Sequence, residues 1–330
     1  MRVVFLHIDL APYHNWVFRE LILMGYKVTV YYYDKKYKEP NFLKGKVVFI
    51  YKTKSKIFLF KKSDIVVTAG YSIINYFITA LIHKKIRNGK TKFTCDTISK
   101  RSLSHKLYNN IGRFIFPNAY DYCLAAGRKQ MSFADKIGFK TNQILNGCYS
   151  ADEVKINSNF KKNKNTILFV GRLETVKGLE QFITWFLDYE NMNKFVFNII
   201  GFGELEDFVS NISNSYDNIN FLGKLDNSMV QKEMEKSSIF ILPSVFEPWG
   251  VVLHEAAAYG CFLIANQNVV SASTFIKTSN GYIFRNYDEL TAIYNRYLDF
   301  SETELNIISK LSVKLSKKIT PNLIAKNIIK

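Results

Sequence analysis

The sequence predicts an α/β protein of two domains, each a parallel sheet with helices on both faces. Its 330 residues exceed the usual size of roughly 100–200 residues for one domain. Hydrophobic residues make up 48% of the chain and charged residues 22%, a mixture that excludes a disordered chain and a coiled coil. Short β-rich runs alternate with helix-length segments along most of the chain, which is typical of parallel sheets.

The first half opens on a β-α-β pattern. A β-rich run at 2–8 is followed by a helical stretch at about 16–24 and a second run at 27–33. Further runs of strand length, separated by helix-length segments, lie at 46–51, 64–69, 91–95, 121–125 and 143–145. We therefore expect one Rossmann-like domain over residues 1–150.

The second half repeats the pattern. Residues 151–165 are polar, rich in Lys and Asn and without periodicity, so they are predicted to form a linker. Strands are then expected at 166–170, 195–200, 219–222, 239–242 and 262–265, and helices at 179–189, 205–213, 229–236 and about 250–259. We expect a second Rossmann-like domain over 151–305 and a helical segment, 306–330, that returns to the first domain.

Charge divides the chain unevenly. Residues 1–150 carry 26 Lys and Arg against 8 Asp and Glu, a net charge of +18, whereas residues 151–330 have a net charge of −1. This asymmetry predicts that the first half faces a polyanion, which is a nucleic acid, an anionic membrane leaflet or an acidic glycan. The alternative is that a Lys-rich composition only fills solvated faces.

Several classes of protein are excluded by composition. The longest apolar stretch, 71–82, is shorter than the ~20 residues of a spanning helix. The apolar start is interrupted by His7 and Asp9, unlike a signal peptide. The four cysteines lie far apart without a CxxC pair, so we expect reduced thiols, no zinc site and a cytoplasmic protein.

Residues whose side chains or backbone could bind a ligand or catalyse follow the strands of the second half. Arg172 and Lys177 come after the strand at 166–170, where two cations suit a diphosphate, although solvated turn residues are the alternative. Gly203 lies in a Gly-rich turn that allows the backbone to approach a ligand. Glu247 and Glu255 are separated by seven residues, the first in a loop and the second in the following helix, so both can face one ligand.

These segments resemble the GT-B glycosyltransferases, particularly the retaining, nucleotide-sugar-dependent family 4. The resemblance lies in five ordered segments: FVGRLETVKG at 169–178, IIGFGE at 199–204, INFLGKL at 219–225, ILPSVFEPWGVVLHEAAAYG at 241–260 and NGYIF at 280–284. It implies a GT-B fold, an α/β architecture in which two Rossmann-like domains face each other across a cleft.

The resemblance also implies roles for individual residues. Arg172 and Lys177 would hold the donor diphosphate, Glu255 would accept hydrogen bonds from the ribose, and Glu247 would lie beside the donor sugar as a catalytic residue. The backbone after Pro248, at Gly250 and Val251, would face the phosphates from a helix N-terminus. Because the chain has no DxD motif, we expect protein groups to neutralise the leaving diphosphate, without a metal ion or other cofactor.

The first domain resembles the family less closely. It has Asp9-Leu-Ala-Pro-Tyr-His14 where family members have a glycine pair, so His14 is a candidate for substrate binding or a cap of the first helix. Asp96 follows the strand at 91–95 and is a candidate for contacting the acceptor or the donor sugar, or an N-cap of the next helix. His254 is predicted to pack against the core or the interdomain surface rather than to catalyse.

The expected activity is transfer of a sugar from a UDP- or GDP-sugar to a hydroxyl of an envelope glycan or lipid-linked oligosaccharide, as in lipopolysaccharide or capsule biosynthesis. The basic first domain, with Lys bordering apolar residues at 57–62 and 83–87, predicts peripheral binding to an anionic membrane surface. Two rival interpretations are a basic nucleic-acid-binding protein and an inactive GT-B partner subunit. No zinc finger, RNP motif or Arg-rich tract favours nucleic acid, and the four charged site residues argue against inactivity.

Overall fold

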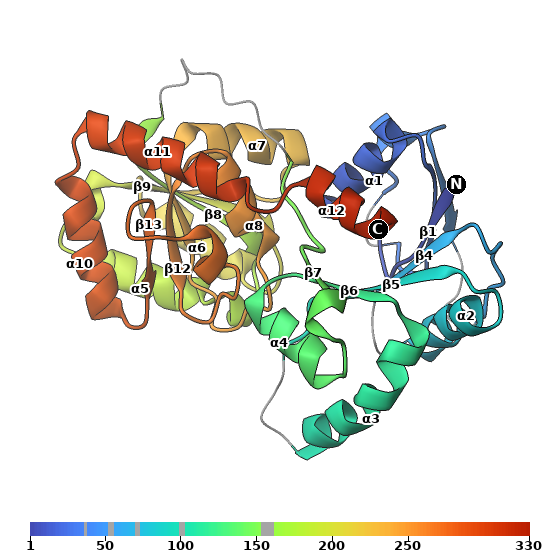
Figure 1. The fold of residues 1–330 in the computed structure, drawn as a ribbon. Helices are drawn as coiled ribbons and strands as arrows, with labels where there is room; N and C mark the ends of the chain where they lie inside the picture. Colours follow the sequence, from blue (N-terminus) through green and yellow to red (C-terminus); the bar gives the residue numbers. More distant parts are fainter. Residues whose placement is uncertain (36–37, 52–55, 70–72, 99–102, 153–161) are drawn as a thin grey trace. The chain divides into compact units, whose positions relative to one another are not determined.

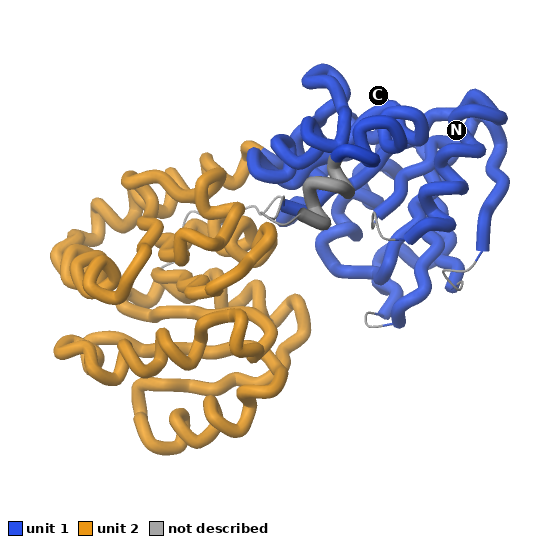
Figure 2. The backbone as a smooth tube through the Cα atoms, turned by 90° about the horizontal axis from the view of Figure 1, so that it is seen from below, with its two compact units in different colours: residues 1–152, 319–330 blue, residues 153–318 orange. Residues whose placement is uncertain are grey.

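A computed structural model describes residues 1–330 except 36–37, 52–55, 70–72, 99–102 and 153–161. The chain forms two compact units (Figure 2). Unit 1 comprises Met1–Asp152 together with Ile319–Lys330, and unit 2 comprises Glu153–Lys318. In the described residues, no helix is both long enough and apolar enough to span a bilayer.

Unit 1 is built on a seven-stranded sheet in which every pair of neighbouring strands is parallel, in the order β3-β2-β1-β4-β5-β6-β7. Its strands are β1 (Arg2–Leu6), β2 (Lys27–Tyr32), β3 (Val47–Tyr51), β4 (Ile65–Ala69), β5 (Lys90–Cys95), β6 (Tyr122–Ala125) and β7 (Ile144–Asn146). Its α-helices are α1 (Tyr13–Leu23), α2 (Ile74–Lys85), α3 (Leu103–Ala119), α4 (Arg128–Lys136) and α12 (Pro321–Ile329), with 3₁₀ turns η1 (Asn41–Leu43) and η2 (Thr141–Gln143). Each strand predicted in this half is present to within two residues at either end.

Helices cover both faces of this sheet (Figure 1). Helices α1 and α12 lie on one face, and α2, α3 and α4 lie on the other. The central strands β1 and β4 are almost entirely apolar because both of their faces are buried. One core cluster joins Val4, Leu6 and Val66 of these strands to Phe60 and to Tyr76 of α2.

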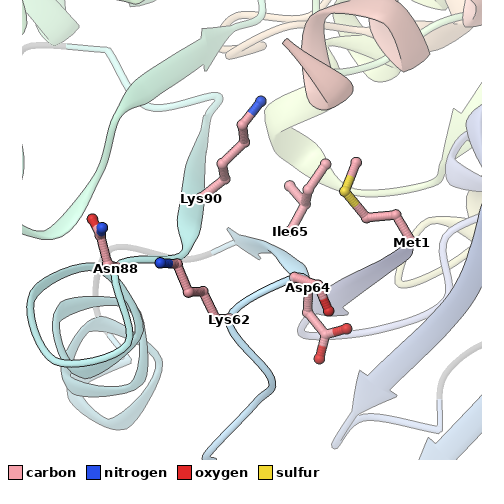
Figure 3. Close-up of a pocket in the computed structure, with 7 residues that line it drawn as sticks. Met1, Lys62, Asp64, Ile65, Asn88 and Lys90 are labelled. Atoms are coloured by element: carbon pink, nitrogen blue, oxygen red, sulfur yellow. The ribbon is translucent and has the colours of Figure 1, made fainter.

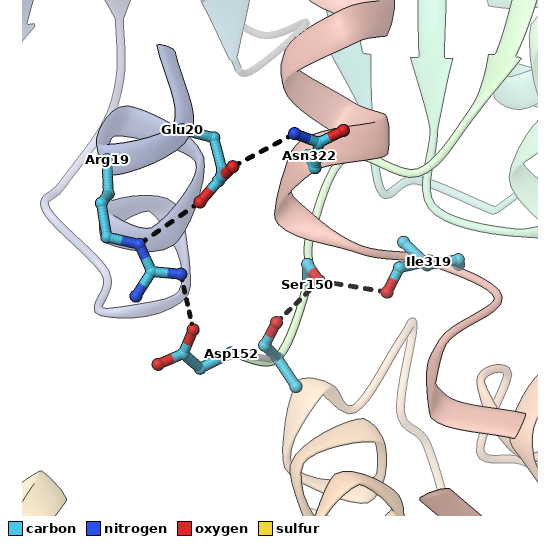
Figure 4. Close-up of polar contacts among 7 residues, drawn as sticks. Arg19, Glu20, Ser150, Asp152, Ile319 and Asn322 are labelled. Atoms are coloured by element: carbon cyan, nitrogen blue, oxygen red, sulfur yellow. Dashed lines mark hydrogen bonds and ion pairs between the residues drawn. The ribbon is translucent and has the colours of Figure 1, made fainter. Parts of the chain in front are cut away.

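The end of the chain is part of unit 1. The Asn322 side chain donates to the Glu20 carboxylate (3.2 Å), and the Ser150 hydroxyl donates to the Ile319 carbonyl (3.2 Å) (Figure 4). Gly147 leaves the space that Ile319 and Ile324 occupy, since a Cβ there would lie 3.0 and 3.1 Å from their side chains. The segment 306–330 is thus divided, with α12 in unit 1 and the preceding helix in unit 2.

Unit 2 contains a six-stranded parallel sheet in the order β10-β9-β8-β11-β12-β13. Its strands are β8 (Asn163–Arg172), β9 (Val196–Phe202), β10 (Ile219–Phe221), β11 (Ser237–Leu242), β12 (Phe262–Asn266) and β13 (Gly281–Phe284). Its helices are α5 (Leu179–Asp188), α6 (Glu206–Ser215), α7 (Asn227–Lys236), α8 (Val251–Ala258), α9 (Ala272–Phe275), α10 (Tyr287–Leu298) and α11 (Glu302–Ser316), with 3₁₀ turns η3 (Thr175–Lys177) and η4 (Met192–Lys194). The two predicted parallel α/β sheets are confirmed.

Strand β8 begins earlier than the sequence predicts. Asn163–Asn165 were expected in the linker, but Asn163 pairs with Ser237 of β11. The Lys162 ammonium donates to the Met234, Glu235 and Ser237 carbonyls, which fixes this polar start of the strand. Within the predicted linker, residues 153–161 lie outside the described residues.

Candidate nucleotide-sugar site

The candidate site lies where the strand order of unit 2 reverses. From β8 the chain adds β9 and β10 on one side and then β11, β12 and β13 on the other, so β8 and β11 flank the switch point. In open parallel sheets, ligands bind outside the carboxyl ends of the strands at this point. The segments that leave β8 and β11 carry Lys177 and Glu247.

These two segments approach each other closely. The Val245 amide donates to the Val176 carbonyl (3.0 Å), which ties the loop after β11 to η3. Gly178 caps α5 with a φ of +67°, and a Cβ at this position would collide with the Pro243 carbonyl oxygen. Only glycine combines this left-handed conformation with this close approach.

Lys177 and Glu247 form an ion pair at the switch point. The Lys177 ammonium donates to Oε2 of Glu247, and both side chains are mostly buried. Glu247 is held in place by its backbone, because its carbonyl accepts from the Val270 amide (3.1 Å). The structure therefore brings together two predicted site residues that are far apart in the sequence.

Two other charged groups line the same strand edge. Arg172 ends β8 and pairs with Glu174, and its side chain is about half exposed. The Glu204 carboxylate follows β9 and accepts from the backbone amide (2.8 Å) and the hydroxyl (2.9 Å) of Thr175. These bonds, the amide bond first, lower the pKa of Glu204. Gly203, the predicted close-approach residue, donates its amide to the Glu206 carboxylate (2.8 Å).

Helix α8 starts at Val251, four residues after Glu247. Gly250 is its N-cap with a φ of +81°, and a Cβ there would lie 3.0 Å from Cγ of Glu247. Pro248 precedes this cap and Val251 is the first helical residue. The first amides of an α-helix lack intrahelical acceptors and carry partial positive charge. The start of α8 therefore adds hydrogen-bond donors beside the ion pair.

Glu255 lies in the fifth position of α8 and is partly buried. Its carboxylate has no hydrogen bond or ion pair to any residue in the part of the chain that the structure describes. Burial without a partner raises its pKa to about 7. A carboxylate in this state is a ready acceptor for the hydroxyl groups of a ligand.

The neighbouring His254 faces the core, as predicted. Its Nε2 lies 2.8 Å from the Ser316 carbonyl oxygen, and its ring stacks on Phe275 with centroids 4.1 Å apart. Burial lowers its pKa to about 4. His254 therefore packs α8 against α11 and α9 within unit 2.

In unit 1, neither His14 nor Asp96 caps a helix. Pro12 is the N-cap of α1, and His14 is buried with its ring 4.2 Å from that of His7. Desolvation, and to a smaller extent His7, holds the pKa of His14 well below its ordinary value. Helix α3 begins at Leu103, too far along the chain for Asp96 to cap it. Both capping alternatives are wrong.

Asp96 instead belongs to a group of side chains at the carboxyl edge of the unit 1 sheet. The Tyr149 hydroxyl donates to Oδ2 of Asp96 (2.9 Å), and the Tyr149 ring lies 5.5 Å from that of His14. Sequence reasoning missed Tyr149, and it also missed the role of Glu174 and Glu204 in holding Arg172 and Thr175. Glu204 stands in the Gly-rich turn after β9, which was the available signal, whereas nothing local marks Tyr149.

Among the described residues, no group of three or more His, Cys, Asp or Glu side chains is arranged to hold a metal ion. A separate pocket of about 560 Å³ lies in unit 1 at the amino ends of β1, β4 and β5 (Figure 3). It is lined by Met1, Lys62, Ser63, Asp64, Ile65, Asn88 and Lys90. Its place at the opposite edge of the strands sets it apart from the Asp96 group.

Residues 150–313, which include every residue of the unit 2 site, match the family model of glycosyl transferases group 1. The chain belongs to this family. Relatives of the chain include an uncharacterized glycosyltransferase of Haemophilus influenzae, 24% identical over 61% of this chain and 56% of that protein. An uncharacterized 41.2 kDa protein in the cps region of Klebsiella pneumoniae is 27% identical over 68% of this chain and 64% of that protein. The chain thus spans less than two thirds of the length of these relatives.

Solved structures match this group 1 chain over its whole length. Anabaena Alr3699/HepE in complex with UDP and glucose has a TM-score of 0.72 at 14% identity, covering 100% of this chain and 98% of that one. An Escherichia coli trehalose-6-phosphate structure with bound UDP-2-fluoro glucose has a TM-score of 0.73 at 13% identity, with the same coverage. These likenesses establish the fold, and the GT-B class that the sequence resemblance implied is confirmed.

Proposed function

We propose that this protein is a retaining glycosyltransferase that moves a hexose from a nucleoside-diphosphate sugar to an acceptor hydroxyl. The observation that carries the proposal is the convergence of Lys177, Glu247 and the start of α8 at the switch point of unit 2. Membership of glycosyl transferases group 1 supports the same reaction.

The donor diphosphate is proposed to bind between Lys177, Arg172 and the first amides of α8. Lys177 supplies a compact charge and Arg172 a planar fork of donors. Both cations are paired with glutamates in the structure, so the diphosphate replaces Glu247 and Glu174 as their partner. This exchange keeps each cation compensated before and after the ligand binds.

The ribose of the donor is proposed to bind Glu255. The carboxylate has a raised pKa because it is desolvated and unpartnered. Two ribose hydroxyls would donate to it and supply the missing hydrogen bonds. The Glu255 carboxylate would therefore distinguish a nucleotide, which has a ribose, from inorganic diphosphate.

In the reaction, a bond forms between the acceptor oxygen and the anomeric carbon while the bond from that carbon to the diphosphate oxygen breaks. The acceptor proton passes to the leaving phosphate. Positive charge develops on the sugar in an oxocarbenium-like transition state. Lys177, Arg172 and the α8 amides stabilise the departing anion, and Glu247 lies beside the sugar. No cofactor beyond the donor is part of the proposal.

The donor is proposed to be a UDP- or GDP-sugar, and the acceptor an envelope glycan or lipid-linked oligosaccharide of lipopolysaccharide or capsule. Structural neighbours are described with UDP, glucose or a UDP-glucose analogue, which supports a hexose donor. A relative in a cps region supports the glycan acceptor. Asp96 and His14 are the candidate acceptor contacts, and the protein would act in the cytoplasm at the inner face of the membrane.

Isothermal titration of the whole chain with UDP and GDP tests the donor site. Lys177→Ala should weaken binding of the preferred nucleotide at least tenfold, because it removes a buried cation from the diphosphate. The matched control is Lys194→Ala, since Lys194 is also the last residue of a 3₁₀ turn but is exposed and away from the switch point. Equal affinity in Lys177→Ala and Lys194→Ala would contradict the site.

A further inference from the structure

Helix α3 of unit 1 presents apolar side chains to solvent. Ile111, Phe114 and Ile115 are exposed, and Phe114 is 77% accessible. Their i, i+3, i+4 spacing places them along one stripe of the helix. The opposite stripe already packs into the core through Phe116 and Ala119. A surface helix normally presents polar residues to solvent and buries its apolar ones. This stripe is apolar although it is not buried, so packing within unit 1 does not explain it.

The neighbouring elements continue this apolar surface. Ile74 at the start of α2 is 68% accessible, and Ile86 after its end is 74% accessible. In the extended segment 56–62, Phe58 and Phe60 point inward while Ile57 and Leu59 are exposed. Exposed large apolar residues thus recur on three adjacent elements, whereas single ones scattered over a surface need no explanation.

Direct contacts join these elements into one layer. The Phe58 amide donates to the Thr79 hydroxyl of α2 (3.1 Å). Lys84 of α2 donates to the Pro117 carbonyl of α3 (3.0 Å) and to the Tyr120 carbonyl (2.7 Å). We call the outer surface of 56–62, 74–87 and 110–119 the α2–α3 face.

The charged residues of the α2–α3 face are all basic. Its three segments contain seven Lys and Arg residues and no Asp or Glu, and one of them, Lys84, pairs with Asp121 beyond the face (3.1 Å). In unit 2 the long helices α5, α6, α7, α10 and α11 each carry at least two acidic residues, so composition alone does not account for the difference. Lys56, Lys62, Lys85 and Arg87 are exposed beside the apolar residues. Lys62 also lines the pocket at the amino ends of the strands (Figure 3).

We propose that the α2–α3 face docks on an anionic lipid bilayer, with Phe114 and Ile111 in the acyl boundary and the lysines at the headgroups. Cations and apolar side chains on one surface match an anionic bilayer, which offers phosphates above hydrocarbon. A nucleic acid would neutralise the lysines but would leave the Ile and Phe side chains without a partner. Part of the excess positive charge of residues 1–150 is then explained by one surface, the α2–α3 face, and by one ligand, an anionic bilayer. The inference deepens the location at the membrane that the proposed function includes, and it does not depend on the donor chemistry proposed for unit 2.

The test is co-sedimentation of the whole chain with vesicles. Binding is expected to vesicles of phosphatidylcholine with 30% phosphatidylglycerol at low salt, and to weaken in 0.5 M NaCl. The double variant Ile111→Ser/Phe114→Ser should bind at least tenfold more weakly. The matched control is Leu23→Ser, which removes a side chain of 74% accessibility from α1 on the other face of the sheet. All three residues are exposed, so folding is expected to be retained.

Three results would overturn the proposal. One is no binding to the anionic vesicles, and another is equal binding by the double variant and Leu23→Ser. The third is binding to duplex RNA that outcompetes the vesicles and is unaffected in the double variant, which would assign the face to nucleic acid. Titration with UDP or GDP on the same variants keeps the two proposals apart, because donor binding in unit 2 should be unchanged by either substitution.

Discussion

The Lys177 ammonium donates to the Glu247 carboxylate across 70 residues of sequence. The pair joins the segment after β8 to the segment after β11, and both side chains are mostly buried. The charge of Lys177 is therefore neutralised by that of Glu247 when no donor is bound. A diphosphate bound to Lys177, as we propose, would compete with Glu247 for the ammonium, so we expect the affinity for the donor and the position of Glu247 to be linked.

Glu247→Gln should separate donor binding from sugar transfer. Removing the carboxylate frees Lys177 for the diphosphate, so UDP or GDP should bind as tightly as in the wild type or up to about tenfold more tightly. Turnover should fall by roughly 10²–10³, because the charge beside the reacting sugar is lost. Titration calorimetry and release of nucleotide from the sugar donor measure the two effects. Asp288→Asn, an exposed carboxylate in α10, is the control; markedly weaker nucleotide binding by Glu247→Gln would argue against the linkage.

Glu255→Gln should stabilise the protein in a pH-dependent way. Desolvation raises the pKa of Glu255 from 4.5 to about 7, so the folded state binds more protons than the unfolded state between these values. The stability of the wild type should therefore fall as pH rises from 4.5 to 7, and the substitution should gain about 1–3 kcal/mol at pH 8. The gain should vanish near pH 4.5.

Denaturant unfolding at several pH values measures this gain. The Asp288→Asn control should show no such dependence, since Asp288 is exposed. A gain for Glu255→Gln that is the same at pH 5 and pH 8 would show that the carboxylate is not desolvated. The same substitution should weaken nucleotide binding, because an amide oxygen is a poorer acceptor than a carboxylate.

Lys92→Met should stabilise unit 1. Lys92 is fully buried in β5, and its ammonium lies 3.9 Å from the centroid of the Tyr122 ring. Its nitrogen has no hydrogen-bond partner among the described residues. Burial lowers its pKa from 10.5 to about 8, so the unfolded state binds more protons between these values. The free energy of unfolding of the wild type should therefore increase as the pH rises from about 8 to 10.5. Lys92→Met should add about 1–3 kcal/mol to that free energy at pH 7, and this gain should shrink as the pH rises.

Thermal and denaturant unfolding at pH 7 and pH 10 check this gain. Lys129→Met, which replaces an exposed lysine of α4, should change stability little at either pH. A loss of stability in Lys92→Met at pH 7 would mean that the contact with Tyr122 outweighs desolvation of the ammonium.

The sequence alone predicted every strand of the unit 1 sheet, five of the six strands of the unit 2 sheet, and the edge at which the candidate unit 2 site lies; the edge strand β13 was not predicted. The periodicity of apolar residues and the glycines between elements are local signals that mark strands and helices. The alternation of strands and helices along the chain then limits how parallel strands can be arranged in a sheet. The spacing of Glu247 and Glu255 placed one in a loop and the other in the following helix. The family resemblance supplied the roles of Arg172 and Lys177.

Tertiary structure alone decided which charges meet. The pairing of Lys177 with Glu247 and the bond from Tyr149 to Asp96 join residues that are distant in sequence. So does the start of β8, where a polar segment forms a strand because Asn163 pairs with Ser237 and the preceding Lys162 donates to the Ser237 carbonyl. Such contacts depend on which residues lie close together in the folded protein, and no local pattern of residue types encodes them.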